Sequence, residues 1–183
     1  MLRVKADDFD AFDRLITRHR NPVVNTLYKI TGRRDGSEDL AQEVFLRVFR
    51  ARKTYQAKAR FATWLFRIVR NVAYNAVRDR NRHKDVSTFT NGFEKDPGEA
   101  VFKSEQPGPE EVARALDLRR DLEKAMTLLS FNQRTAMVLS RIEGMAYVEV
   151  AKILGTSEAA VKMLVSRARK ILARELAHYV QET

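Results

Sequence analysis

Residues 146–170 combine side chains that suit DNA recognition with a spacing that would present them on one surface. Apolar residues recur at helical steps on both sides of Gly155, which predicts two short helices that bury against each other. Gly155 stands where a helix commonly ends in a left-handed residue, and Thr156 and Ser157 follow as candidate caps of the second helix. The pattern predicts a helix-turn-helix. The residues of the second helix that lie off its apolar stripe are Glu158, Lys162, Met163, Ser166, Arg167, Lys170 and Arg174.

This second face fits the demands on a recognition helix, which packs one side on its partner and offers the other to the major groove. The alternative is a solvated surface on an ordinary helical hairpin. The composition favours the first interpretation, because the 183 residues carry a net charge of +10 and a sequence pI of about 10.1. Such an excess of positive charge suits a polyanionic partner. The charge alone does not distinguish a DNA-binding protein from an RNA-binding protein.

A second concentration of binding chemistry lies in residues 52–63, where aromatic and cationic side chains are interleaved. Aromatic rings among cations are what an unstacked base needs. The helix predicted to follow carries arginine and asparagine outside its apolar stripe, and these residues suit phosphate contacts and base-edge hydrogen bonds. A solvated basic face is the alternative for this helix. Trp64, at its start, is either a core residue or a further member of the aromatic group.

The composition also excludes several classes of site. The chain has no cysteine, so disulfides, thiolate metal sites and cysteine nucleophiles are excluded. The histidines His19, His83 and His178 are too scattered for a metal site, and no nucleophile, base and orienting group fall together. We therefore expect no metal, no cofactor and no catalytic residue. No apolar run approaches the ~20 residues of a membrane span, and the first eight residues lack the apolar core of a signal peptide, which favours a cytoplasmic protein.

Helical periodicity extends through most of the chain and predicts an all-α fold of two helical domains, residues 1–84 and 112–183. Between them, residues 85–111 hold most of the prolines and a run of acidic residues, which predicts an acidic flexible linker. In the first domain we expect a break at Pro22 and a helix from Ser37 to about Arg52.

The second domain begins with an amphipathic pattern over residues 112–129. Ser130 and Gln133 then form a capping-box pattern for a helix whose buried stripe would be Val138, Leu139 and Ile142. These two helices are expected to act as the scaffold on which the helix-turn-helix rests.

Together these motifs resemble the extracytoplasmic function (ECF) sigma factors, a group of the sigma-70 family. Residues 35–49 and 61–75 look like the region-two domain of that family, and the helix-turn-helix looks like its region-four domain. The resemblance covers nearly the whole chain, with the parts in the expected order. It implies a dissociable, non-catalytic subunit of bacterial RNA polymerase that directs the enzyme to promoters, with core RNA polymerase and promoter DNA as partners. It leaves open whether an anti-sigma factor also binds, and which promoter is read.

The resemblance also implies roles for individual residues. The surface for core polymerase would comprise Asp39, Gln42, Glu43, Leu46 and Arg47. Binding of the minus-ten element, with a pocket for a flipped base, would involve Tyr55, Lys58, Arg60, Phe61, Trp64, Arg67, Asn71, Tyr74 and Asn75. The minus-thirty-five element would be read by Glu158, Lys162, Met163, Ser166, Arg167 and Lys170. The linker would thread toward the RNA exit path.

Two alternatives from other classes explain less of the chain. A helix-turn-helix regulator that acts without core polymerase accounts for residues 146–174 but leaves the aromatic and basic N-terminal segment without a purpose. An RNA-binding structural protein accounts for the charge but not for the paired domains. An enzyme is the least expected class, for the reason given above.

Overall fold

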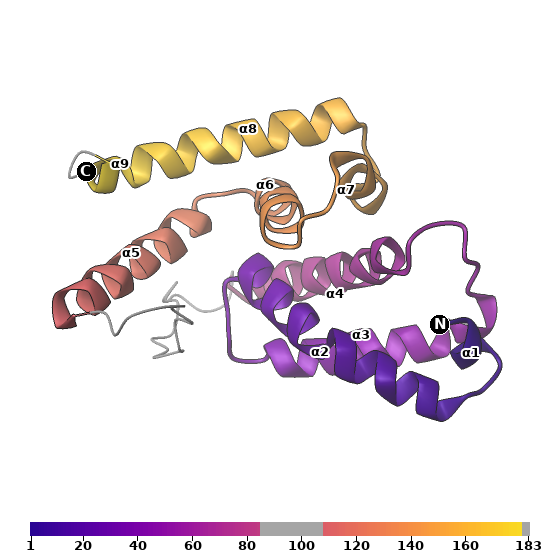
Figure 1. The fold of residues 1–183 in the computed structure, drawn as a ribbon. Coiled ribbons are helices and arrows are strands. Elements are labelled where there is room, and N and C mark those ends of the chain that lie inside the picture. Colours follow the sequence, from indigo (N-terminus) through magenta and orange to yellow (C-terminus); the bar gives the residue numbers. More distant parts are fainter. Residues whose placement is uncertain (85–107, 181–183) are drawn as a thin grey trace.

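The computed structural model describes residues 1–84 and 108–180, and every regular element in these two ranges is helical. The helices form two bodies, which Figure 1 shows stacked one above the other. The N-terminal body comprises α1 (Leu2–Lys5), α2 (Phe9–Thr31), α3 (Ser37–Arg50), the short 3-10 helix η1 (Arg52–Thr54) and α4 (Phe61–Lys84). The C-terminal body comprises α5 (Pro109–Thr127), α6 (Phe131–Met137), the π-helical turn η2 (Val138–Ile142), α7 (Tyr147–Leu154), α8 (Glu158–Glu175) and α9 (Ala177–Val180). The predicted all-α class is confirmed.

The N-terminal body is built on α2, α3 and α4, which pack on one another. The Asp8 carboxylate caps α2 by accepting a hydrogen bond from the Ala11 backbone N–H (2.8 Å). The same helix ends at Gly32, whose φ of 74° lies in the left-handed region that favours glycine. The three helices bury a shared core of small and branched apolar side chains that includes Val23, Leu27, Ile30, Val44, Val48, Leu65 and Val69.

The predicted break at Pro22 is wrong, because α2 runs through this residue. Proline removes one backbone donor and crowds the preceding turn, so it destabilises a helix interior. Pro22 is exposed, however, and a carbonyl left unpaired on this side can bind water. The apolar residues on both sides of it, including Leu15 and Leu27, share one buried face. Burial of this continuous stripe outweighs the proline penalty.

In the C-terminal body, α6 begins with the predicted capping box. The Ser130 hydroxyl accepts a hydrogen bond from the Gln133 N–H (3.3 Å), and Gln133 Oε1 accepts one from the Ser130 N–H (2.9 Å). Helix α6 then widens into η2, where the Glu143 N–H bonds to the carbonyl of Val138 (3.1 Å), five residues back. Because this wide turn shifts the helical register, Ile142, which was predicted to be buried, is 48% exposed.

Helix α5 begins at Pro109, inside the range predicted as linker, with proline at the start of the helix where its missing N–H costs little. The predicted apolar stripe is buried only at Ala125, near the C-terminal end of this helix, and at Leu129, just beyond it. Three large apolar residues of the predicted stripe are exposed, Val112, Leu118 and Leu122, and Leu116 of the same helix is exposed as well. Most of the predicted acidic linker, residues 85–107, falls outside the described residues.

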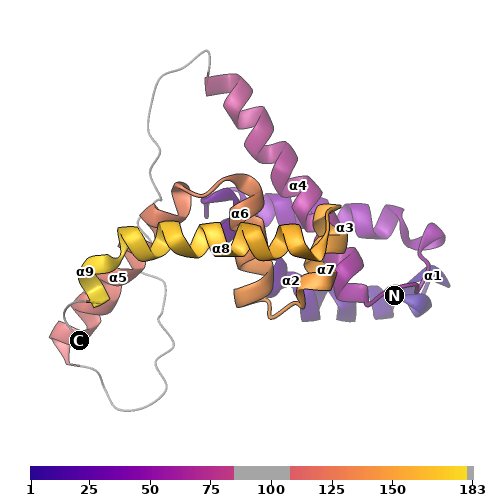
Figure 2. The same cartoon turned by 90° about the horizontal axis from the view of Figure 1, so that it is seen from above.

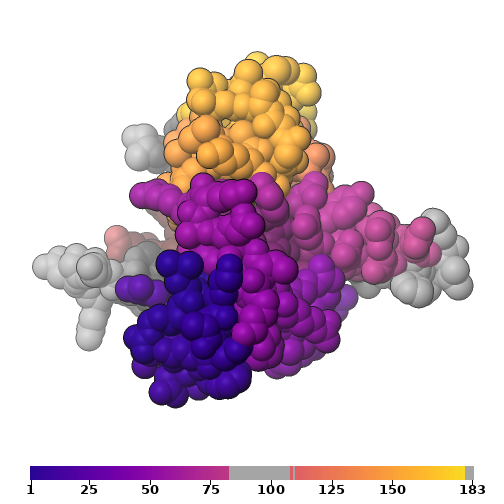
Figure 3. Space-filling view, turned by 90° about the vertical axis from the view of Figure 1, so that its right-hand side faces the viewer, coloured from indigo at the N-terminus to yellow at the C-terminus, as the bar shows by residue number. Residues whose placement is uncertain are grey.

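The two bodies pack against each other, α4 on α7 and α2 on both α6 and η2. Figure 2 shows α6 and α7 lying across the N-terminal helices, and Figure 3 shows the C-terminal body resting on the chain around the start of α4. Thr26 Oγ1 donates a hydrogen bond to Glu143 Oε1 (2.7 Å), and Arg134 Nη1 donates one to the Ile30 carbonyl (3.1 Å). Ile30 lies in the last turn of α2, so Arg134 pairs a carbonyl that the helix itself leaves without a partner.

A third polar contact joins the same helix to α5. The Tyr28 hydroxyl donates a hydrogen bond to Glu123 Oε1 (2.9 Å). Burial, followed by this hydrogen bond, raises the pKa of Tyr28 to about 12. The phenol therefore stays protonated and acts as a donor across the physiological pH range.

Candidate nucleic-acid and protein interfaces

The predicted helix-turn-helix is formed by α7 and α8. Gly155 ends α7 with a φ of 68°, and the Thr156 N–H bonds back to the Ala151 carbonyl (3.0 Å). The Ser157 hydroxyl caps α8 by accepting a hydrogen bond from the Ala160 N–H (3.1 Å). Of the two cap candidates, Ser157 is thus the one whose side chain performs the role.

Helix α8 divides into a buried stripe and an exposed polar face. Val161, Val165 and Ala168 are buried against α6 and α7. The six residues predicted to read DNA are all exposed, namely Glu158, Lys162, Met163, Ser166, Arg167 and Lys170. Lys162 Nζ pairs with Glu158 Oε1 (3.1 Å), so one cation of this face is partly offset within the free protein. The exposed arginine and lysines give the face the charge and donors that phosphate contacts use.

A group of aromatic rings lies between η1 and the first turn of α4. The Tyr55 and Trp64 ring centroids are 5.0 Å apart in an edge-to-face arrangement, and Phe61 lies 5.8 Å from Trp64. His19 approaches Phe61 from α2, at 5.3 Å. Tyr55 is only 5% exposed, so its ring is part of the packing and not a free stacking surface in this conformation. Lys58 and Arg60 in the same segment are exposed.

Beside these rings, the structure has a pocket with a volume of about 400 Å³. It is lined by Met1, Leu2 and Arg3 from the N-terminal segment, Ala11 and Arg14 from α2, and Tyr55, Ala57 and Phe61. The volume falls within the range of small-molecule sites. The lining is mainly apolar and aromatic with two arginines, which suits a planar base attached to a phosphate backbone. Sequence reasoning identified Tyr55 and Phe61 but not the N-terminal residues, which carry no local signal.

The outer face of α4 carries Arg67, Asn71 and Tyr74 as exposed residues, with Asn75 half-buried beside them. Part of this face is occupied by the C-terminal body. Arg67 Nη2 donates a hydrogen bond to the Lys152 carbonyl of α7 (3.0 Å). The Tyr74 ring meets the Phe131 ring of α6 at 5.3 Å.

Glu149 of α7 is the main polar contact to the start of α4. Its Oε1 atom accepts a hydrogen bond from Thr63 Oγ1 (3.2 Å), and its Oε2 atom lies 3.7 Å from Arg60 Nη1. Glu149 also accepts a hydrogen bond from the Ala146 N–H at the start of its own helix (3.3 Å). Sequence reasoning did not single out this residue, since nothing in its local pattern indicates a partner at Thr63. The structure therefore brings α7 onto the very surface predicted to bind the minus-ten element.

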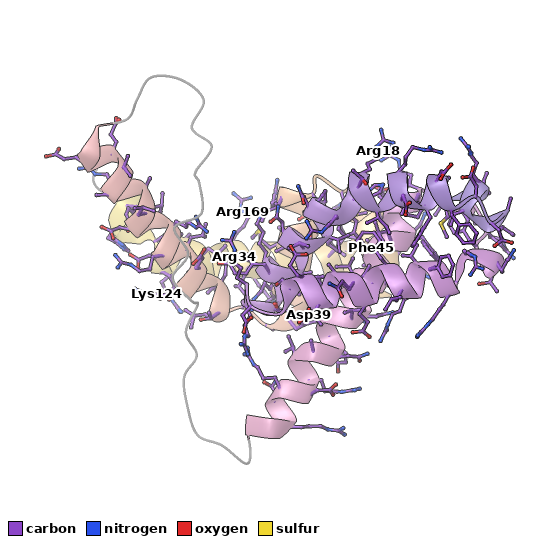
Figure 4. The ribbon with its side chains drawn as sticks, turned by 90° about the horizontal axis from the view of Figure 1, so that it is seen from below. Arg18, Arg34, Asp39, Phe45, Lys124 and Arg169 are labelled. Carbon is purple, nitrogen blue, oxygen red and sulfur yellow. The ribbon has the colours of Figure 1, made fainter. Side chains whose placement is uncertain are left out.

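The predicted polymerase-binding face lies on α3, away from the contact between the two bodies. Asp39, Gln42 and Leu46 are exposed, and Leu46 is 54% exposed despite its apolar side chain. Glu43 and Arg47 are half-buried and form an ion pair one helical turn apart. The opposite side of α3 is buried through Ala41, Val44, Phe45 and Val48. Figure 4 labels Asp39 and Phe45 on this helix.

Within residues 1–84 and 108–180, no group of histidine, aspartate and glutamate side chains could hold a metal ion. No helix in the same ranges is long and apolar enough to cross a membrane.

Comparison with known proteins identifies the family. The Sigma-70 region 2 model matches residues 15–83, and the Sigma-70, region 4 model matches residues 119–172. The chain is 33% identical over 167 residues to the RNA polymerase sigma factor CarQ of Myxococcus xanthus, covering 91% of this chain and 89% of CarQ. It is also 33% identical over 173 residues to the ECF RNA polymerase sigma factor SigE of Mycolicibacterium smegmatis, covering 94% of this chain but 64% of SigE. The chain belongs to the ECF group of RNA polymerase sigma factors.

The fold agrees with a solved structure of the same family. The sigma factor RpoE of Bartonella quintana, solved in complex with the anti-sigma factor NepR, superposes with a TM-score of 0.75. The two sequences are 25% identical, and the match covers 91% of this chain and 97% of RpoE. The helical domains of this chain are therefore those of a sigma factor over nearly its whole length.

Proposed function

We propose that this chain is the promoter-recognition subunit of a bacterial RNA polymerase and directs transcription initiation at a specific set of promoters. In this role α8 reads the minus-thirty-five element, the segment from Tyr55 to Asn75 binds the minus-ten element, and α3 binds the core enzyme. Bond formation is carried out by the core, and this chain supplies recognition. We infer a cytoplasmic location, because such a subunit acts on chromosomal DNA.

The observation that carries the proposal is the separation of three chemically different surfaces on one chain. The exposed face of α8 is rich in cations, the pocket beside Phe61 is aromatic and basic, and the exposed face of α3 mixes acids with Leu46. Two DNA-binding chemistries on separate bodies suit a protein that contacts two promoter elements at once. An exposed leucine among charges suits a protein partner. The similarity to RpoE, solved with NepR, supports an anti-sigma factor as a further partner.

The test is transcription in vitro with purified core RNA polymerase and a library of genomic fragments from the source bacterium. We expect specific run-off products only when this chain is added, and we expect the chain to copurify with the core. If the chain binds specific DNA without core and yields no initiation with it, the alternative of a helix-turn-helix regulator is correct.

A charge-reversal pair tests the α3 surface within the same assay. Asp39→Lys with Glu43→Lys should abolish assembly with the core, because the pair changes the charge of the exposed face without reaching the buried stripe. The matched control is Asp10→Lys with Asp13→Lys, which makes the same charge change on exposed positions of α2. Wild-type assembly by the α3 variant would overturn this assignment.

A further inference from the structure

The N-terminal segment of the chain is tied to the loop that precedes α4. Figure 1 shows α1 beside this loop, and α1 contacts η1 directly. Val4 of α1 is 1% exposed, so the segment is anchored in the core of the N-terminal body. Among the described residues, Asp7 is the sole non-glycine residue with a positive φ, at 62°. Aspartate tolerates this left-handed backbone better than most residues, although it is uncommon and often marks a functional constraint.

The polar contacts of this segment converge on the start of the loop. One carboxylate oxygen of Asp7 accepts a hydrogen bond from Arg52 Nε (3.1 Å), and the other accepts one from Lys53 Nζ. Lys5 Nζ donates a hydrogen bond to the backbone carbonyl of Tyr55 (2.9 Å). The hydrogen bonds from Lys53 and Arg52 also hold the pKa of Asp7 below its usual range. Residues far apart in sequence thus fix where the loop begins.

The same segment forms one wall of the pocket beside the aromatic rings. Met1, Leu2 and Arg3 line it together with Tyr55, Ala57 and Phe61. The position of the loop relative to α1 therefore affects the shape of the pocket, because both segments contribute to its lining. A base gains stacking energy when the groups that line the pocket are already in place. If the lining residues must become ordered on binding, the cost in conformational entropy lowers the affinity.

We propose that Lys5 and Asp7 are positioning residues that hold the pocket at the width required to receive an unpaired base of single-stranded promoter DNA. The proposal rests on the function proposed above. Asp7 fixes the η1 end of the loop and Lys5 fixes Tyr55. Arg14 supplies positive charge to the lining for the phosphates of the same strand, together with Arg3, whose charge is partly offset by its ion pair with Asp8 (2.7 Å). Neither Lys5 nor Asp7 touches the base.

The experiment uses holoenzyme assembled from core polymerase and the full chain, with a single-stranded oligonucleotide of the non-template minus-ten sequence. A 2-aminopurine at the unpaired position reports capture of the base. Asp7→Asn removes the charge but keeps a residue that accepts a left-handed backbone, and Lys5→Met removes the donor but keeps the length of the side chain. Asp10→Asn, an exposed carboxylate near the start of α2, is the matched control.

We expect Asp7→Asn and Lys5→Met to weaken oligonucleotide binding by about 1.5- to fivefold, the range expected for exposed polar pairs, and to reduce the fluorescence change. Core affinity and thermal unfolding should stay at wild-type values, and Lys5→Arg should restore binding because it can still donate to the Tyr55 carbonyl. If Asp7→Asn lowers stability, Lys5→Met still tests the proposal because it leaves the Asp7 backbone untouched.

Two results would overturn the proposal, and they differ from failure of the proposed function. If Lys5→Met and Asp7→Asn bind the oligonucleotide like the wild type while Phe61→Ala does not, the pocket is the base site but the N-terminal segment does not position it. If Phe61→Ala also binds normally, the pocket is not the base site. In both cases promoter-specific initiation by the wild-type chain would leave the proposed function standing.

Discussion

Removing two hydroxyl groups from α2 should separate the two bodies of the free protein. Thr26→Val and Tyr28→Phe each delete a donor to a carboxylate of the C-terminal body and leave the side-chain shape nearly unchanged. A hydrogen bond to a charged group contributes about 1.5–3 kcal/mol net. We use the lower end, because Glu123 keeps Arg119 Nε as a partner at 3.2 Å when the Tyr28 hydroxyl is lost.

Two such bonds sum to about 3 kcal/mol, and since 1.4 kcal/mol is a factor of ten, the equilibrium between packed and separated bodies should shift about 100-fold. The native chain has no cysteine, so Asn21→Cys and Ala173→Cys, at exposed positions on the two bodies, provide a clean pair for distance measurement by electron spin resonance. We expect a new population at longer distance in the double variant.

The control is Thr17→Val with Tyr179→Phe, which deletes the same groups from hydrogen bonds made within one body, to the Asp13 carbonyl and to Asp121. If the distance distributions of the variant and this control coincide, the hydroxyls do not hold the bodies together and the reasoning is refuted. A second measurement uses single-stranded minus-ten DNA without core. Because α7 covers part of α4, apparent affinity should rise in proportion to the separated fraction.

Three further predictions concern single residues. Arg167→Ala should weaken binding to the minus-thirty-five element. If Arg167 contacts phosphate, the slope of log affinity against log salt concentration should also fall by about 1. Unchanged binding across a salt titration would contradict a DNA-facing role for Arg167. Burial, and then Arg18, lowers the pKa of His19, so the neutral ring is favoured in the fold. Unfolding free energy should therefore be greatest above about pH 6.5 and fall as the pH drops further, and His19→Gln should flatten this dependence in denaturant titrations. Leu139→Ala, at a position with 0% exposure, should cost about 2–5 kcal/mol in chemical unfolding, and a loss below about 1 kcal/mol would mean that the cavity collapses.

The sequence predicts those parts of the fold that are encoded by neighbours along the chain. Gly155, Ser157 and the pair Ser130 and Gln133 mark helix ends through contacts within a few residues, and each takes the predicted role. The break predicted at Pro22 is wrong because packing of α2 on α3 and α4 outweighs the cost of a proline inside the helix. This packing involves residues distant in sequence, so the local pattern does not show it.

Helical periodicity predicts which residues of α3 and α8 lie off the buried stripe, and of the predicted residues on these two faces Glu43 and Arg47 alone are half-buried. The packing of the two bodies could not be predicted in this way. It depends on pairs such as Thr26 with Glu143 and Thr63 with Glu149, which are separated by many residues and carry no spacing signal. The contribution of Lys5 to the pocket is hidden for the same reason, since its partner is the backbone carbonyl of Tyr55.

The wide turn η2 makes the orientation of the helix-turn-helix depend on a single residue. An α-helix advances about 100° per residue, so deleting one residue between Val138 and Ile142 would restore a regular helix and rotate the exit of the chain by about that angle. Glu143 would then turn away from Thr26, and α7 would leave in another direction. The turn thus determines the direction in which α7 and α8 follow η2. Insertions or deletions within η2 should therefore be far less tolerated than substitutions.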